Sequence, residues 1–279
     1  MKINSMKLKT LKENFLEQYR NKNITYDELA AKHGVARVTL TKLFKKEGLK
    51  TNKIIDREKI NHDYFNKINS SKKAYMLGYF AADGCITVLK TKYSLSKRIQ
   101  FSCTEGDVEL LLFIKKELNL NNKIVKSKRY KVKGTKYLSK PMNSLFFVSE
   151  PIFDKLLELG LNERKTYSEF TIPEIKEEFI KYFILGYFDG DGSIVISEGI
   201  RANGYKYKNT QFSIVSKGKL LLESISNYFK TLKIKSSIKE SKGSYVLRIT
   251  NKEDIIKIKE LFYDSDLGLE RKKLKFNKI

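Results

Sequence analysis

Two aspartates, Asp83 and Asp191, are the residues whose type and spacing most directly suggest chemistry. They hold matching positions, 108 residues apart, in the segments AYMLGYFAADGCITV (74–88) and YFILGYFDGDGSIVI (182–196). In both segments a run of apolar and small residues typical of a helix ends in the acid, and a glycine and a strand-like run follow. The two acids therefore stand at equivalent points of a repeated helix-to-strand unit.

The small residues in these segments predict how the acids are positioned. Residues four apart lie on one face of a helix, and small side chains there let two helices approach almost backbone to backbone. The helix interface predicted from this spacing consists of Gly78, Ala82, Gly186 and Gly190. If the two helices pack through these faces, their ends coincide and Asp83 comes close to Asp191.

Two adjacent carboxylates at a surface that faces a polyanion are costly, because each raises the pKa of the other and both repel phosphate. A divalent cation between them removes both costs. Oxygen ligands with open positions suit Mg²⁺, and paired metal ions can activate a water and stabilise a leaving oxygen. The expected site is therefore Mg²⁺, or another divalent metal, held by Asp83 and Asp191, and the expected reaction is phosphodiester hydrolysis.

Composition and charge point to the same class of partner. The chain has 279 residues and a formal charge of +24, from 56 Lys+Arg against 32 Asp+Glu. Such an excess favours nucleic acid, since each neutralised phosphate releases counterions. The alternative is an ordinary protein from an organism whose coding bias favours lysine.

Other classes of protein fit the composition poorly. There are two cysteines and two histidines, too few for a zinc finger or a disulfide framework, and both Cys85 and Cys103 are expected to be buried thiols. No run of about 18 apolar residues occurs, and the first residues lack the apolar core of a signal peptide. We expect an intracellular protein with no membrane partner.

The repeat extends well beyond the acidic segments and organises most of the chain. RIQFSCTEGDVELLLFIKKEL is echoed by NTQFSIVSKGKLLLESISNYF, and GLNERKT by GLERKKL, so the copies run from about 69 to 170 and from 171 to 279. Apolar periodicity in each copy predicts helix, strand, strand, helix, two strands and helix. The predicted fold class is α+β, with two pseudo-symmetric halves and antiparallel sheets.

One face of each predicted sheet is apolar and packs on the helices, which leaves the polar face for a ligand. In the first copy Ile99, Phe101 and Cys103 alternate with more polar neighbours. The candidate DNA-contacting residues on the polar faces are Arg98, Gln100, Ser102, Gln211, Ser213 and Arg248.

A further segment precedes the repeat. Residues 10–50 contain two amphipathic helices around a glycine turn, which predicts a helix-turn-helix DNA-binding domain over 1–52 and a linker over 53–68. The helix from about 36 to 46 would read the groove through Arg37, Thr39, Thr41 and Lys42. The alternative is a helical hairpin without a role in DNA binding.

MLGYFAADG and ILGYFDGDG resemble the two motifs of the single-chain LAGLIDADG homing endonucleases, and the resemblance covers about 210 residues. It implies two pseudo-symmetric αββαββα halves that form a saddle over double-stranded DNA, in a monomer with internal two-fold symmetry. It also implies that Asp83 and Asp191 bind metal. Ala81 departs from the motif, which has an acid where the second copy has Asp189.

The resemblance further implies catalytic roles for residues outside the motifs. Lys165 and Lys272 match the basic residue that follows the last helix of each half and lies near a scissile phosphate. Glu105 and Lys217 match a polar residue at the end of the second strand. Because a glutamate and a lysine differ in charge, the two active sites should not be chemically equal.

The function expected from these residues is that of a homing endonuclease, intron-encoded or free-standing, which cuts both strands of a long DNA site. Two alternatives stay open. One is a transcriptional regulator that keeps the fold and binds DNA without cutting it. The other is a maturase that assists the splicing of an intron RNA.

Overall fold

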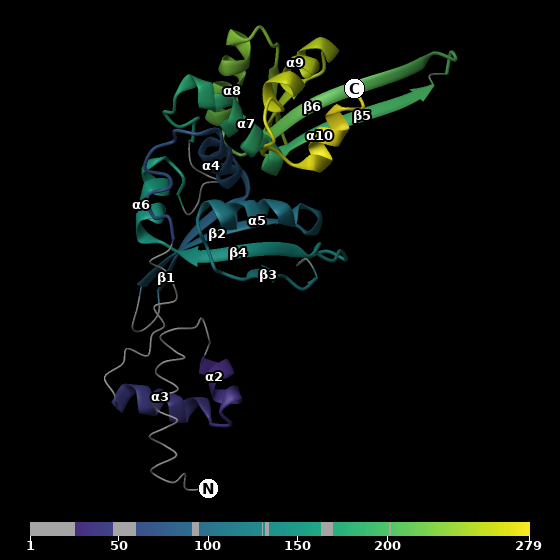
Figure 1. Ribbon diagram of the computed structural model, residues 1–279. Coiled ribbons are helices and arrows are strands. Elements are labelled where there is room, and N and C mark those ends of the chain that lie inside the picture. Colours follow the sequence, from purple (N-terminus) through teal and green to yellow (C-terminus); the bar gives the residue numbers. More distant parts are fainter. Residues whose placement is uncertain are drawn as a thin grey trace. The chain divides into compact units, whose positions relative to one another are not determined.

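The computed structural model describes residues 26–46, 60–90, 95–129, 131, 134–162, 170–200 and 202–279. The chain divides into two compact units, 1–58 and 59–279. Figure 1 shows the helices and strands of both units. Within the described ranges, no helix is long and apolar enough to cross a bilayer.

The described part of the first unit is a pair of helices, α2 (Tyr26–Lys32) and α3 (Arg37–Lys46). Gly34, at φ +62, makes the turn between them in a conformation that glycine adopts at little cost. Leu29 of α2 and Leu40 of α3 are buried. Two helices around a glycine turn match the sequence pattern, and a role for α3 in reading DNA stays a prediction.

The larger unit repeats one order of elements twice. The first half contains α4 (Ser71–Asp83), β1 (Cys85–Lys90), β2 (Leu95–Thr104), the 3-10 turn η2 (Glu105–Asp107), α5 (Val108–Glu117), β3 (Ile124–Lys126), β4 (Met142–Val148) and α6 (Glu150–Glu158). The second half contains α7 (Glu177–Asp191), β5 (Gly192–Ile200), β6 (Lys206–Ser216), α8 (Lys219–Thr231), β7 (Ser237–Ser241), β8 (Ser244–Ile249), α9 (Lys252–Phe262) and α10 (Glu270–Phe276). The predicted α+β order is confirmed in both halves.

Each half folds its strands into a four-stranded antiparallel sheet. The strand orders, β1-β2-β4-β3 and β5-β6-β8-β7, are equivalent. The helices cover the apolar face of each sheet, so that Ile99 and Phe101 in β2 and Phe212 and Ile214 in β6 are buried. The opposite face carries the polar residues, as the alternation along the strands predicts.

The two motif helices, α4 and α7, lie side by side at the centre of this unit, and each packs on its own sheet (Figure 1). Phe80 of α4 packs edge-on against Phe101, with ring centroids 5.0 Å apart. Phe188 of α7 stacks on Phe212 at 4.8 Å. These aromatic pairs fix each motif helix to the sheet that follows it.

The first hairpin of each half differs in register although the sequences align. Cys85 pairs with Gln100 in the first half, whereas Ser193 pairs with Ser213 in the second. Gln211, the sequence counterpart of Gln100, pairs with Val195. The shift is two residues, so it keeps the polar and apolar faces but moves each side chain along the strand.

The segment predicted as a linker over 53–68 is partly built into the larger unit. Ile60, Tyr64 and Phe65 are buried, and the Tyr64 hydroxyl donates to Glu117 Oε2 at 3.1 Å. The boundary between the units falls at 58/59, and the aromatic side chains that follow it cover the end of α5. Because most residues of this stretch are polar, the burial of these three side chains was not predicted from its composition.

Candidate functional site

The crossing of α4 and α7 brings their backbones into contact at glycine. A Cβ atom at Gly78 would lie 1.9 Å from the carbonyl oxygen of Phe183, and one at Gly186 would lie 2.0 Å from that of Tyr75. No side chain fits in either place without moving backbone. The small residues predicted to line the interface therefore lie where the helices meet.

The ends of the helices meet as well. A Cβ atom at Gly190 would lie 2.3 Å from the Cβ of Ala82 and 3.1 Å from Asp83 Oδ2. The carboxyl group of Asp83 thus lies beside the residue that precedes Asp191. Both acids are exposed, at the last turns of their helices.

The glycine after each acid is explained by a steric contact. Gly84 and Gly192 end their helices in extended conformations, and the amide of each donates to a phenylalanine carbonyl, Phe80 or Phe188. A Cβ atom at either glycine would lie 2.1 Å from the ring of that same phenylalanine. The chain can therefore pass from helix to strand immediately after the acid.

A tyrosine lies behind each acid, one helical turn earlier. Burial raises the pKa of Tyr79, and the negative charge of Asp83 raises it further. Burial likewise raises the pKa of Tyr187. The negative charge of Asp191 raises it further, and that of Asp83 does so more weakly. The negative charges of both acids thus favour the protonated hydroxyl of Tyr187.

Lys272 lies in a different setting from the one that the family resemblance implies. Its side chain is 3% exposed, and its ammonium group donates to the carbonyls of Asp189 (2.9 Å) and Gly192 (2.7 Å) and also to that of Phe188. The nitrogen lies 4.4 Å from the Phe188 ring centroid, and burial lowers its pKa to about 8. Lys272 binds the carbonyls at the end of α7. Its counterpart Lys165 lies outside the described residues.

Asp189 forms a buried polar network that the first half lacks. Its Oδ2 accepts from the Tyr75 hydroxyl and from the Leu269 amide, both at 2.8 Å, and burial raises its pKa to about 6. Its Oδ1 has no hydrogen-bond partner among the described residues. In the alignment of the two copies, Ala81 is the counterpart of Asp189 and Phe183 is the counterpart of Tyr75. The acid and its hydrogen-bond donor are therefore both replaced by apolar residues in the other copy.

Glu105 and Lys217 lie at equivalent positions in different settings. Glu105 is exposed and paired with Lys126, and the hydrogen bond from that lysine lowers its pKa. Lys217 donates to the Gly243 carbonyl at 3.0 Å and lines a cleft of about 320 Å³ together with Asp191 and Tyr187. A lysine therefore lies in the cleft beside Asp191, and the equivalent glutamate pairs with a lysine of its own half.

The predicted DNA-contacting side chains fall into three groups. In the first half, Arg98 lies over the Phe146 ring at 5.1 Å, and Gln100 donates to Ser102 at 2.8 Å on the polar face. In the second half, Ser213 pairs with Arg248 and only 8% of it is exposed, so it offers little surface. The α3 candidates are exposed: Arg37, Thr39, Thr41 and Lys42.

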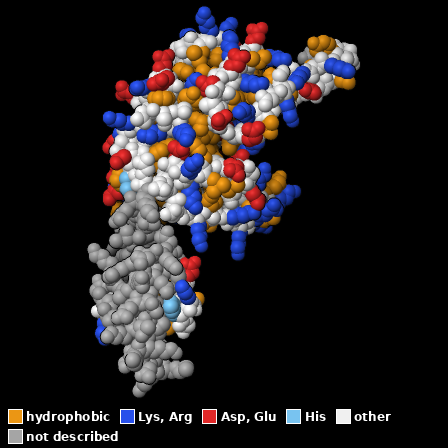
Figure 2. All heavy atoms as spheres, in the orientation of Figure 1, with side chains coloured by type: hydrophobic (Ala, Val, Ile, Leu, Met, Phe, Trp, Pro, Cys, Tyr) orange, Lys and Arg blue, Asp and Glu red, His pale blue; other side chains and the backbone are white. Residues whose placement is uncertain are grey.

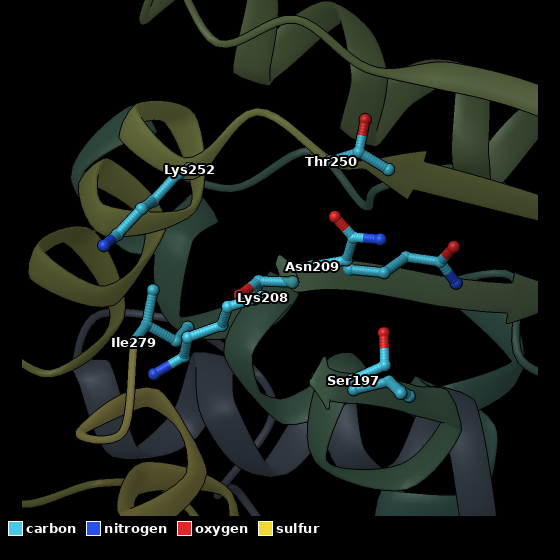
Figure 3. A pocket seen from close by; sticks show the side chains of 9 residues that line it. Ser197, Lys208, Asn209, Thr250, Lys252 and Ile279 are labelled. Atoms are coloured by element: carbon cyan, nitrogen blue, oxygen red, sulfur yellow. The ribbon is translucent and has the colours of Figure 1, made fainter. Parts of the chain in front are cut away.

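A second cleft, of about 550 Å³, lies beside β6 and was not predicted from the sequence (Figure 3). Asn209 and Ser197 face each other on paired strands there, and Lys208 and Lys252 reach along its side. It lies where β6 continues past the last residue of β8. Only the relative lengths of these strands, which periodicity does not determine, could have indicated it. Cys85, expected to be buried, is exposed at the start of β1.

Comparison with known proteins agrees with this geometry. Residues 178–262 match the family model of the LAGLIDADG-like domain. The I-SmaMI LAGLIDADG homing endonuclease bound to cleaved DNA aligns with a TM-score of 0.53 at 17% identity, over 74% of this chain and 87% of that chain. The same enzyme bound to uncleaved DNA with calcium ions gives 0.53 at 17%, over 74% and 89%.

A curated relative, Uncharacterized protein MJ1054 of Methanocaldococcus jannaschii, is 28% identical over 203 residues. The match covers 68% of this chain, which spans about a fifth of the relative's length (20%). The second half thus contains a LAGLIDADG-like domain, and the larger unit has the fold of the two-motif LAGLIDADG homing endonucleases. The predicted resemblance and the predicted saddle of two sheets are confirmed.

Proposed function

We propose that this chain is a site-specific endonuclease that hydrolyses phosphodiester bonds in double-stranded DNA. One observation carries the proposal: the backbone contact between α4 and α7 places two exposed carboxylates, Asp83 and Asp191, together at the ends of their helices. A protein that only binds DNA gains nothing from two adjacent acids at a surface that must approach phosphate. The proteins with this fold described above include one bound to cleaved DNA, which supports the proposal.

The donor set at this position fits a divalent metal that is shared with the substrate. Among the described residues, no cluster of three or more His, Cys, Asp or Glu forms a complete metal site. Two carboxylates leave coordination positions for water and phosphate oxygens, as Mg²⁺ prefers. When bound, the metal supplies an activated water and charge stabilisation at the leaving oxygen.

This donor set predicts that metal affinity depends on DNA. We expect weak binding of Mn²⁺ or Mg²⁺ to the free protein and tighter binding once phosphate oxygens complete the shell. Isothermal titration calorimetry with and without a cognate duplex measures the difference in metal affinity. Ca²⁺ is titrated as well, as an ion that permits DNA binding. Equal affinity with and without DNA would contradict a shared site.

The remaining residues have supporting roles in this proposal. Tyr79 and Tyr187 fill the space behind the acids and exclude water from that side. Lys272 holds the carbonyls around the backbone of Asp191, and Lys217 lies in the cleft near the same acid. The polar faces of the two sheets bind the duplex. Because a single chain supplies both halves, the active form is a monomer.

The test incubates the purified chain and Mg²⁺ with plasmids that carry candidate sites. We expect linear product from the wild type and none from Asp83→Asn or Asp191→Asn, while both variants still shift the duplex on a gel. Glu198→Gln, at an exposed acid of β5, is the matched control and should cut normally. If a site that the protein binds tightly is never cut, the protein is a DNA-binding regulator. If intron RNA is bound in preference to duplex DNA, it is a maturase.

A further inference from the structure

The two halves close their second hairpin in different ways. In the second half, β7 and β8 are joined by Lys242 and Gly243 alone, at φ +50 and +70, a two-residue turn with positive φ at both positions. In the first half, β3 ends at Lys126 and β4 begins at Met142. We call residues 128–141, which replace the two-residue turn, the basic arm.

The basic arm carries charge of one sign only. It contains no Asp or Glu, and its basic residues are Lys128, Arg129, Lys131, Lys133, Lys136 and Lys140. All of these that the structure describes are exposed. No ion pair to them occurs among the described residues, although Arg129 contributes weakly to lowering the pKa of Glu105. Figure 2 shows lysine and arginine side chains gathered around this end of the first half.

The basic arm prolongs the hairpin that β3 and β4 form. Ser127 donates its amide to the Met142 carbonyl at 2.8 Å, and its hydroxyl accepts from the Met142 amide at 3.0 Å. This pair closes the regular ladder, and the bridge between Lys131 and Leu138 holds the two sides of the arm together further out. Ser102 and Ser144 lie on the polar face of the same ladder and share a hydrogen bond of 2.8 Å.

The fold does not require this insertion, because the second half closes the same hairpin with two residues. We propose that the basic arm binds the phosphate backbone of duplex DNA beyond the part of the target that the first half covers. Lysine and arginine contacts to phosphate add affinity without reading bases, and their number sets the salt dependence of binding. The footprint is therefore longer on the side of the first half. This inference rests on the proposed function only in assigning a DNA target.

Two variants test the basic arm. In the first, residues 128–141 are replaced by Asn-Gly, so that Ser127 and Met142 become the closing pair, as Ser241 and Ser244 are in the second half. In the second, the arm keeps its length and five side chains change to Gln: Lys128, Arg129, Lys131, Lys136 and Lys140. The control makes five lysine-to-Gln changes on or next to helices α5, α8 and α9, at Lys115, Lys116, Lys230, Lys233 and Lys259. All proteins are the full chain, and thermal unfolding confirms that each folds.

Each lost phosphate contact should reduce the slope of log K against log salt by about 0.9. We expect both arm variants to lose about 3 in slope, to bind at least about tenfold more weakly at 0.15 M salt, and to give a footprint shortened on one side only. The control variant should lose much less. Cleavage at saturating protein should be unchanged, because the arm is not part of the acidic site.

An unchanged slope and footprint in the charge variant would overturn the inference, even if the shortened variant failed to fold. An equal loss in the control would overturn it too, as would weakened binding to intron RNA with DNA binding intact. The two proposals fail separately. If the wild type binds DNA through the arm but never cuts, the endonuclease fails and the arm stands. If it cuts and the arm variants bind normally, only the arm fails.

Discussion

Asp189 and Lys272 are the two charged side chains buried beside the acidic site, and the repeat partner of Asp189 is Ala81, whereas that of Lys272 is also a lysine, Lys165. A cation and an acid are buried together at the end of α7, and each binds backbone groups: three carbonyls for Lys272 and the Leu269 amide for Asp189. Buried polar groups with several partners hold their neighbours in one arrangement. The end of α7, which carries Asp191, is therefore more firmly fixed than sequence spacing alone would suggest.

We predict that Lys272→Met lowers the free energy of unfolding by roughly 3 kcal/mol, because it leaves buried carbonyls without donors. Urea unfolding measures this loss, and the exposed Lys275→Met on the same helix should change stability by less than about 0.5 kcal/mol. If Lys272 positions the end of α7, Lys272→Met should also raise the metal concentration needed for cleavage. It should leave the salt dependence of DNA binding unaltered. A slope reduced by about 0.9 would instead indicate a phosphate contact, as the family resemblance implies.

The sequence could predict Asp83 and Asp191 as neighbours because the glycine spacing leaves one way for the helices to meet. It could not predict the burial of Lys272, because a lysine after a helix is exposed unless several acceptors converge on it. Convergence of the Phe188, Asp189 and Gly192 carbonyls is a property of the helix end in three dimensions.

At the scale of elements, the crossing of α4 and α7 determines whether the site exists. Each helix places a glycine against a backbone carbonyl of the other, at Gly78 and Gly186. The residues that make these contacts come from both copies of the repeat, so neither half has a complete site alone.

We predict that Gly186→Ala destabilises the fold by about 3 kcal/mol or more, because its Cβ would overlap the Tyr75 carbonyl and force the helices apart. Chemical denaturation measures the loss, and cleavage should fall even where the variant is folded. Gly106→Ala is the matched control, since a Cβ there meets nothing within 4 Å. Equal stability of the two variants would show that the helices can separate without cost.

The strands were predicted less completely than the helices. Alternation correctly predicted which face of β2 and β6 is buried, but alternation is unchanged by a shift of two residues. The different pairings of Cys85 and Ser193 were therefore invisible in the sequence. Specificity for bases depends on this register, and so the base sequence recognised does not follow from the alignment of the copies.

At the scale of the whole larger unit, an ion pair between Arg271 and Asp107 joins the two halves. Arg271 of α10 donates to both oxygens of Asp107, at 2.8 and 3.1 Å, and Thr104 donates to the same carboxylate. Burial acts to raise the pKa of Asp107, but the hydrogen bonds from Arg271 and Thr104 outweigh it and hold the pKa below its ordinary value.

A depressed acid pKa contributes stability above the unfolded value, near 4, and loses it as the pH falls through the folded value. We therefore predict that the stability advantage of the wild type over Asp107→Asn is full at pH 6 and shrinks below about pH 4. Urea unfolding across this range measures it, with Glu198→Gln as the control. An advantage that is constant with pH would mean that the ion pair does not join the halves in solution.

The first unit, predicted to be a helix-turn-helix domain, gives a prediction on the same scale. Removal of residues 1–52 should shorten the DNA footprint and weaken binding while cutting continues, because both acids lie in the larger unit. Footprinting and plasmid cleavage with the shortened chain measure the two effects. Complete loss of cutting would mean that the first unit helps to build the larger one.

The close approach of the Gly190 backbone to Ala82 and to the carboxyl group of Asp83 holds the ends of the two motif helices together. Both carboxylates belong to one rigid helix pair, so the distance between the two positions at which DNA can be cut is set by the protein backbone. If the chain is the endonuclease proposed above, the separation of the two nicks, and with it the length of the single-stranded ends, should then stay the same for every DNA sequence that it cuts. Changes in the sheets would alter which DNA is cut and leave the form of its ends unchanged.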